Sequence, residues 1–281
     1  MNAPARCGIV LHPASHTRSP AMHRRAYEVL GIRARYEVFD TPPAALGAII
    51  ARARAEGFRQ LAISIPHKQA VMAHLDSIEE TARRIGAVNT VTRVEAKGGA
   101  KLVGANTDWL GLTRALARET SIRGRRAVVL GAGGTARAAA FALAQGGAQV
   151  QILNRSAARA TALASELGGG IRAAPGGLGA LCELEYDVLV NTTSVGLRSD
   201  ESPVPAEALR ALNADSVVFD SVYEPEETRL LREARARGAR CISGKWMLIE
   251  QALEQLRLWT GRAPDASVLA EAFDAAFTPS R

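Results

Sequence analysis

The chain has 281 residues, enough for one large or two medium domains, each with its own hydrophobic core. Hydrophobic residues make up 47% and charged residues 22%, an ordinary balance for a globular protein. The net charge of +7 comes from arginines scattered along the chain, and only 5% of residues are aromatic. This pattern argues against a nucleic-acid-binding surface and indicates a basic surface that favours anionic ligands.

Cysteine and histidine usage predicts a cytoplasmic protein without a metal site. The cysteines, three in number and without metal-ligand spacing, are typical of reduced thiols rather than a disulfide framework. The histidines lie early in the chain and show no ligand spacing. No apolar run reaches the ~18 residues that a membrane span needs, and residues 1–6 carry no apolar signal-peptide region. We therefore expect no membrane partner.

The first hundred residues alternate between strand-like and helix-like segments, which predicts βαβ-type units on a mostly parallel sheet. Ser19 and Pro20 fit the N-cap and first position of a helix. A further helix is expected directly after Pro66. The predicted strands are 7–11, 35–39, 60–65, 88–94 and 101–104, and the predicted helices are 20–30 and 44–56.

The remainder of the chain has the pattern of a Rossmann-like half. Two long helical stretches close it, and we expect them to cross back onto the first domain. The predicted strands are 127–130, 149–153, 187–190, 217–219 and 241–242. The predicted helices are 107–119, 137–145, 157–167, 226–236, 245–259 and 264–277.

A glycine-rich turn after the strand at 127–130 is the most informative motif. The apolar run ending at Leu130 leads directly into G-x-G-x-x-A and then into an alanine-rich helix, the context that a dinucleotide fingerprint requires. Gly131 allows the tight turn, Gly133 lets a pyrophosphate approach the backbone, and Ala136 keeps the helix close to the strand. The alternative is an ordinary glycine turn. The candidate phosphate-binding residues are Gly131, Ala132, Gly133, Gly134, Thr135 and Ala136.

The end of the next strand indicates NADP rather than NAD. Sites for NAD usually place an acidic residue here to bind the ribose 2′-hydroxyl. This chain instead has Asn154, Arg155, Ser156 and Arg159, which suit a 2′-phosphate. The alternative is a solvated pair of arginines at the start of a helix.

Polar residues at other predicted strand and helix ends are candidates for substrate binding and catalysis. Thr17 and Ser19 precede a helix and could bind a carboxylate with its free N–H groups, although a simple cap explains Ser19 equally well. Lys68 is expected on the first turn of a helix, where a cation opposes the helix dipole, so a functional reason is plausible beside an exposed solubilising one. Asn89 and Asp108 lie in polar segments that turn and cap chemistry also explains. A carboxylate such as Asp108 could tune the Lys68 amine, but no spacing shows that they meet.

Taken in order, these segments resemble those of the shikimate dehydrogenase family, over almost the whole chain. Each segment alone is common, whereas all nine in this order are very specific. The matching segments are 16–20, 65–68, 86–90, 106–108, 131–136, 154–156, 191–196, 220–225 and 247–252.

The resemblance implies an enzyme that catalyses the NADP-dependent, reversible reduction of 3-dehydroshikimate to shikimate in aromatic amino-acid biosynthesis. It implies an α/β fold in which residues 1–105 form a substrate-binding domain, helices in 246–281 pack back on it, and 106–245 form a Rossmann-like NADP-binding domain, with a cleft between the two. Oligomeric state is left open between monomer and homodimer.

The resemblance also assigns roles to individual residues. Lys68 and Asp108 match the catalytic pair. The residues that match substrate contacts are Thr17, Ser19, Ser64, Asn89, Tyr223 and Gln251. Beyond the fingerprint and the 2′-phosphate group, Thr192 and Ser194 match cofactor contacts.

Three departures from the family pattern bear on the substrate. Thr17 replaces a common Ser, Ala62 replaces a polar residue that is often Asn, and Trp109 replaces a frequent Gly, which could reshape the cleft. These changes leave the reaction class alone. The alternatives are a quinate or quinate/shikimate dehydrogenase, and a non-catalytic paralogue that binds a ligand, against which the presence of both Lys68 and Asp108 argues.

Overall fold

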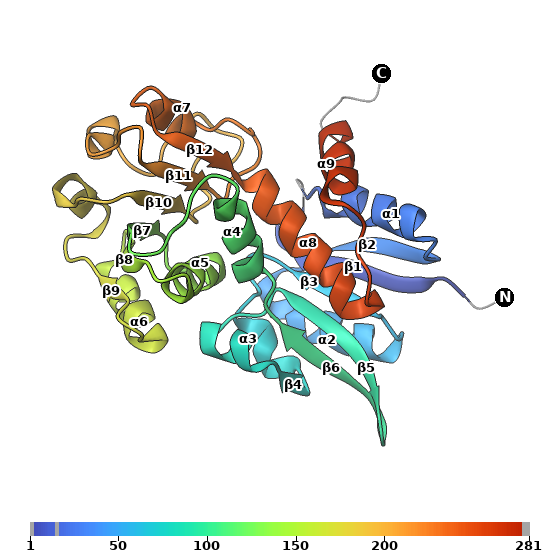
Figure 1. Cartoon of the computed structure of the whole chain (residues 1–281). Coiled ribbons are helices and arrows are strands. Elements are labelled where there is room, and N and C mark those ends of the chain that lie inside the picture. The colour runs from blue at the N-terminus through green and yellow to red at the C-terminus, as the bar shows by residue number, and fades with distance from the viewer. Residues whose placement is uncertain (1–2, 15–16, 277–281) are drawn as a thin grey trace. The chain divides into compact units, whose positions relative to one another are not determined.

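A computed structural model describes residues 3–14 and 17–276 and confirms an α/β fold with two six-stranded sheets (Figure 1). The chain divides into two compact units. The first contains the residues up to Thr107 and those from Gln251 onward, and the second contains Asp108–Glu250. The boundary near Gln251 falls inside helix α8, Gly244–Thr260.

The sheet of the first unit has the strand order β2-β1-β3-β5-β6-β4. Strand β1 pairs in parallel with β2 and β3, whereas β5 pairs antiparallel with β3 and β6 and so forms a hairpin (Figure 1). The apolar residues of β1 and β3 are almost all buried, as expected for strands inside a sheet. The strands are Ala5–Leu11 (β1), Ala34–Asp40 (β2), Gln60–Ile63 (β3), Ser77–Ile78 (β4), Thr90–Ala96 (β5) and Gly99–Ala105 (β6).

The C-terminal helices return to the first unit, as predicted. Helix α9 packs on α1, where the Arg18 guanidinium also donates to the Ala276 carbonyl oxygen. Tyr27 of α1 meets Trp259 of α8 edge to face, with 5.6 Å between ring centroids. The helices that belong wholly to this unit are Ser19–Leu30 (α1), Leu46–Ala55 (α2), Glu80–Ile85 (α3) and Ala266–Ala275 (α9), with short 3₁₀ turns at Pro43–Ala45 and Ala70–His74.

Two local predictions in this unit are wrong. Ser19 is the first residue of α1 and not its N-cap; Arg18 occupies the cap position, with no side-chain cap hydrogen bond. The helix expected directly after Pro66 is a turn that leads into a single 3₁₀ segment. Lys68 therefore lies in a turn, and the argument that it opposes a helix dipole does not apply.

The sheet of the second unit is entirely parallel, with the order β12-β11-β10-β7-β8-β9. Numbered from β7 as the first strand, this is the order 3-2-1-4-5-6 of a Rossmann fold, which confirms that prediction. The direction of strand addition reverses between β7 and β10. The strands are Arg126–Leu130 (β7), Gln149–Leu153 (β8), Arg172–Ala173 (β9), Val188–Asn191 (β10), Val217–Asp220 (β11) and Arg240–Ser243 (β12).

Helices cover both faces of this sheet because successive strand residues are buried on opposite sides. Val129 of β7 packs with residues of α4, α5 and α6 on one face, and Val128 and Leu130 pack with residues of α7 on the other. The helices are Asp108–Ala117 (α4), Gly134–Gln145 (α5), Ala157–Leu167 (α6) and Arg229–Arg235 (α7), with 3₁₀ segments at Gly177–Glu183 and Ala206–Leu209. In the described part of the chain, no helix combines the length and apolar character needed to cross a membrane.

A buried carboxylate joins the ends of β10 and β11. Asp220 is fully buried and accepts hydrogen bonds from Asn191 Nδ2 (2.9 Å), Val222 N (3.0 Å) and Thr228 Oγ1 (2.7 Å). Burial nevertheless raises the pKa of Asp220 from 3.8 to about 6, since desolvation outweighs these hydrogen bonds. Because the folded pKa lies above the unfolded one, this group's contribution to stability is fully present below pH 3.8 and is lost as the pH rises to about 6.

Replacing Asp220 with Asn is expected to remove this pH dependence. The amide can keep the same contacts, with Oδ1 accepting from Asn191 and Val222 and Nδ2 donating to Thr228 Oγ1. Relative to the parent, the unfolding free energy of Asp220→Asn should increase by about 2 kcal/mol between pH 4 and pH 7, measured by urea unfolding. The exposed Asp215→Asn is the matched control and should show no such trend. If the difference in unfolding free energy between Asp220→Asn and the parent does not change with pH, the raised pKa of Asp220 is contradicted.

Candidate active site

The glycine-rich turn lies at the point where the order of strand addition reverses. Gly131 has φ +117°, and a methyl group added to it would lie 2.6 Å from Thr192 Oγ1. Thr192 in turn donates from Oγ1 to the Leu130 carbonyl oxygen (2.6 Å), which ties the segment after β10 to the end of β7. Only glycine meets both the conformational and the steric requirement at this position.

The same turn has features that suit an anion. A methyl group built on Gly133 would meet no heavy atom within 4 Å. Gly133 is also the N-cap of α5, with no side-chain cap hydrogen bond, so the first N–H groups of the helix face this space. Ala136 is buried against the sheet, which brings the helix close to β7. Ala132, Gly134 and Thr135 complete the segment and are half-buried.

The residues after β8 provide positive charge and no carboxylate. Arg155 and Arg159 are exposed at the start of α6. Ser156 is the N-cap of this helix and accepts a hydrogen bond from the Arg159 N–H (3.4 Å), and Asn154 Nδ2 donates to the Ser156 carbonyl oxygen (3.1 Å). The loop is thus held in one conformation with two guanidinium groups turned to solvent, an arrangement that suits a phosphate group.

Ser194 and Tyr223 lie in segments that follow neighbouring strands of this unit. Ser194 is exposed after β10, and Tyr223 is half-buried after β11. Asn191 connects the two segments because it donates to Asp220 and accepts from Thr193 N (3.0 Å) and Thr193 Oγ1 (2.8 Å).

In the first unit, Thr17 and Ser19 lie together at the start of α1. The Ser19 N–H donates to Thr17 Oγ1 at 3.3 Å, so the Thr17 hydroxyl holds the turn before the helix. Thr17 is half-buried and Ser19 is buried. His16, which precedes them in the matched segment, lies outside the described residues.

Lys68 is held in a turn that begins at Ser64, directly after β3. The His67 N–H donates to the Ser64 carbonyl oxygen (2.9 Å), and Val88 N donates to the Lys68 carbonyl oxygen (2.7 Å). The buried His67 ring contacts the Thr41 carbonyl oxygen through Nε2 (2.7 Å), which gives this histidine a structural role. Ser64 and Lys68 are both half-buried and belong to the same short segment.

Asn89 and Gln251 meet, although 162 residues separate them in the sequence. Asn89 Nδ2 donates to Gln251 Oε1 (3.3 Å) and to Thr107 Oγ1 (2.9 Å). Asn89 Oδ1 accepts from Thr107 N (2.7 Å) and Thr90 Oγ1 (2.9 Å). All four side chains are buried, so two predicted site residues, Asn89 and Gln251, are joined within one buried polar cluster of the first unit.

The two residues of the expected catalytic pair belong to different units. Lys68 lies in the first, and Asp108 begins α4 and the second. Asp108 is buried in the first turn of its helix, where the helix dipole favours an acidic residue. Their pairing stays a prediction.

The departures from the family pattern have different structural contexts. Ala62 is buried in β3. Trp109 packs edge to face on Phe141 of α5, with ring centroids 5.7 Å apart, in the core of the second unit. The indole is therefore part of the packing between α4 and α5.

Sequence reasoning missed three residues that hold this site together: Thr90, Thr107 and Gln255. Thr90 and Thr107 lie inside segments that were recognised, but their hydroxyls were not singled out. Gln255 follows Gln251 by four residues, the spacing that places two side chains on the same face of a helix. That spacing was the available signal.

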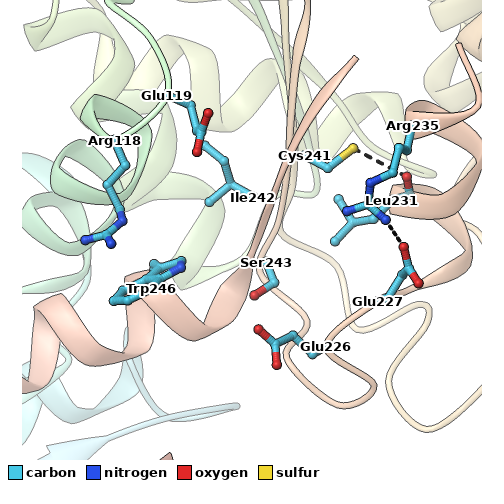
Figure 2. A pocket seen from close by; sticks show the side chains of 10 residues that line it. All are labelled: Arg118, Glu119, Glu226, Glu227, Leu231, Arg235, Cys241, Ile242, Ser243 and Trp246. Atoms are coloured by element: carbon cyan, nitrogen blue, oxygen red, sulfur yellow. Dashed lines mark hydrogen bonds and ion pairs between the residues drawn. The ribbon is translucent and has the colours of Figure 1, made fainter. Parts of the chain in front are cut away.

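A separate pocket of about 220 Å³ in the second unit contains none of the predicted site residues. Figure 2 shows this pocket beside edge strand β12. The Arg118 guanidinium lies over the Trp246 ring, 3.5 Å from its centroid. Arg235 forms an ion pair with Glu227. The charges of the pocket are mixed and partly paired. Within residues 3–14 and 17–276, no three His, Cys, Asp or Glu side chains gather where they could hold a metal ion.

Three family models match the chain, and together they cover most of it. Residues 9–91 match the shikimate dehydrogenase substrate-binding domain, 114–198 match shikimate/quinate 5-dehydrogenase, and 244–272 match the shikimate 5′-dehydrogenase C-terminal domain.

Individual relatives are similar over almost their whole length. The NADP(+) shikimate dehydrogenase of Thermococcus kodakarensis is 45% identical over 262 residues, 93% of each chain. The shikimate 5-dehydrogenase of Thermus thermophilus, solved with NADP(H) and shikimate, superposes with a TM-score of 0.86 at 43% identity, covering 97% of this chain and 100% of that one. The quinate dehydrogenase of Corynebacterium glutamicum, solved with NAD, gives 0.84 at 32% identity, covering 98% and 100%. On this identity and coverage, the chain belongs to the shikimate dehydrogenase family.

Proposed function

We propose that this protein is an NADP-dependent shikimate dehydrogenase that catalyses the reversible reduction of 3-dehydroshikimate to shikimate in aromatic amino-acid biosynthesis. The likeness over the whole chain to a solved relative that holds both NADP(H) and shikimate carries the proposal. The first unit is the substrate domain, with the C-terminal helices as part of it, and the second is the NADP-binding domain.

Residues of the second unit fit NADP. The open space at Gly133 and the uncapped N-terminus of α5 suit the pyrophosphate, and Arg155 and Arg159, with Asn154 and Ser156, suit the 2′-phosphate. Bound there, the nicotinamide supplies the hydride for ketone reduction and accepts it in the reverse direction. Thr192 and Ser194, in the segment after β10, would make further contacts with the cofactor.

Residues of the first unit bind the substrate and move its proton. The hydroxyls of Thr17 and Ser19, with Tyr223 from the second unit, hold the substrate carboxylate. Ser64, Asn89 and Gln251 bind ring hydroxyls and the carbonyl region.

The Lys68 ammonium stabilises the negative charge that develops on the carbonyl oxygen and donates a proton to it from Nζ. Asp108 orients Lys68 and accepts a hydrogen bond from a substrate hydroxyl. The enzyme acts on a small molecule without nucleic-acid or membrane partners, in the cytoplasm, as a monomer or homodimer.

Quinate dehydrogenase is the second candidate, since a solved quinate dehydrogenase is also similar over the whole chain. The two are separated by one set of assays, in which NADP- and NAD-linked absorbance changes are followed with shikimate and quinate in parallel. Turnover of shikimate with NADP supports the proposal. A higher kcat/KM for quinate, or turnover of neither acid, would overturn it.

Lys68→Ala is expected to lower kcat by about 10²–10⁴ with little change in the KM for shikimate, because acid–base and charge stabilisation act mainly in the transition state. The exposed lysine variant Lys101→Ala serves as the control and should keep parental kinetics. A kcat for Lys68→Ala within a few-fold of the parent would remove Lys68 from the catalytic role.

Arg155→Ala should raise the KM for NADP and leave the KM for NAD nearly unchanged, since the loss of a charge-assisted contact to phosphate corresponds to roughly 1.5–3 kcal/mol. Initial rates with each cofactor measure this. Arg123→Ala removes another exposed arginine of the same unit and should affect neither cofactor. Equal losses for both cofactors in Arg155→Ala would mean that the arginine supports the fold instead.

Thr17→Ser should shift the preference towards quinate without abolishing shikimate turnover. Quinate carries an extra hydroxyl on the carbon that bears the carboxylate, where the Thr17 methyl group narrows the site. One methyl group in a tight pocket discriminates by about 1–3 kcal/mol. The ratio of kcat/KM values for the two acids measures the effect, and an unchanged ratio would contradict a steric role for this methyl group.

A further inference from the structure

Helix α8 places two buried glutamines on one face, one helical turn apart. Gln251 and Gln255 are 6% and 1% exposed, respectively. The backbone at Gln255 is fixed as well, because Gln60 Nε2 donates to its carbonyl oxygen at 2.6 Å. The Gln255 side chain is therefore held firmly next to β5.

The orientation of the Gln255 amide follows from its neighbours. Nε2 lies 3.4 Å from the Asn89 carbonyl oxygen and 3.1 Å from Thr90 Oγ1. A carbonyl oxygen can only accept, so the nitrogen of the amide must face it. The opposite orientation would place two acceptors against each other.

The Thr90 hydroxyl links the orientation of the Gln255 amide to that of the Asn89 amide. It accepts from Gln255 and so directs its own hydrogen to Asn89 Oδ1, 2.9 Å away. The Thr107 N–H, which can only donate, occupies the second acceptor position of Oδ1 at 2.7 Å. Asn89 Nδ2 is consequently turned towards Gln251 Oε1, at 3.3 Å, and Gln251 has its acceptor end facing Asn89.

The Gln255 side chain also interacts with a buried ring. Burial lowers the pKa of His23 to about 4, and the Gln255 side chain opposes this shift. Nε2 is the end of the amide that belongs to the series Gln255–Thr90–Asn89–Gln251.

We propose that Gln255 is a positioning residue for the reaction: acting through Thr90, it fixes the Asn89 amide and, through Asn89, the side chain of Gln251. This rests on the proposed function, in which Asn89 and Gln251 bind substrate oxygens.

The relay is the hydrogen-bonded series Gln255–Thr90–Asn89–Gln251. Gln255→Met tests it, with Gln60→Met as the matched control. Each variant replaces one buried glutamine, and each loses a hydrogen bond at the same turn of α8, but only Gln255 contacts Thr90. Gln255→Met should raise the KM for shikimate about tenfold, the loss of one well-oriented hydrogen bond, with kcat changed less than threefold and the KM for NADP unchanged. Gln60→Met should change each constant less than twofold. Equal effects of both variants on the KM for shikimate would overturn the proposal.

The middle of the relay gives a second, independent test. Thr90→Val removes the hydroxyl at nearly constant volume and should reproduce the effect of Gln255→Met, whereas Thr90→Ser keeps the hydroxyl and should restore a KM near the parental value. The double variant Gln255→Met/Thr90→Val should be no worse than Thr90→Val alone, because both changes interrupt one pathway. Additive effects would show that the two residues act separately.

A readout without substrate separates this inference from the proposed function. In ¹H–¹⁵N spectra, solvent exchange of the Asn89 side-chain amide protons should be at least tenfold faster in Gln255→Met than in the parent, and unchanged in Gln60→Met. If the parent uses no shikimate but this difference is seen, the proposed function fails and the relay stands. If the parent uses shikimate and the exchange rates are equal, the relay fails and the function stands.

Discussion

In the second unit, two segments of the chain come into close contact where the order of strand addition reverses. The geometry of the rest of the unit depends on this contact. Gly131 lies so near Thr192 that any side chain there would collide with the threonine hydroxyl, which itself holds the end of β7. This contact sets the path of the turn, and the turn sets where α5 begins. The start of α5 without a side-chain cap and the open space at Gly133 follow from it, so the features that suit a phosphate here are properties of backbone geometry.

The first unit builds its site by a different principle. Its polar groups are side chains buried in pairs, and each orientation is determined by a neighbour that can only donate or only accept. The Thr107 backbone N–H fixes Asn89, which in turn bonds to Gln251. Such a network is sensitive to single changes because a buried polar group that loses its partner is costly. The glycine-rich turn of the second unit thus depends mainly on backbone geometry, and the polar cluster around Asn89 in the first unit depends on side-chain partners.

Periodicity and local signals predicted much of this from the sequence. Strand β8 and helix α6 have the predicted limits, because an apolar strand and an amphipathic helix with Ser156 as its cap need only local information. The turn around Lys68 was mistaken for a helix because a contact between His67 and the distant Thr41 carbonyl oxygen helps to hold it. Gln255 was missed for a similar reason: its partner Thr90 in β5 lies 165 residues away in the sequence. Local patterns do not contain such contacts.

The aromatic packing divides the three tryptophans between the units. Trp259 meets Tyr27 in the first unit, whereas Trp109 on Phe141 and Trp246 beneath Arg118 belong to the second. Intrinsic fluorescence can therefore follow each unit separately once single-tryptophan variants are made. Coincident unfolding curves from Trp259 and Trp109 would mean that the protein unfolds as one cooperative body, and separate curves that each half has a stability of its own. The native tryptophans can thus report whether the two units unfold together.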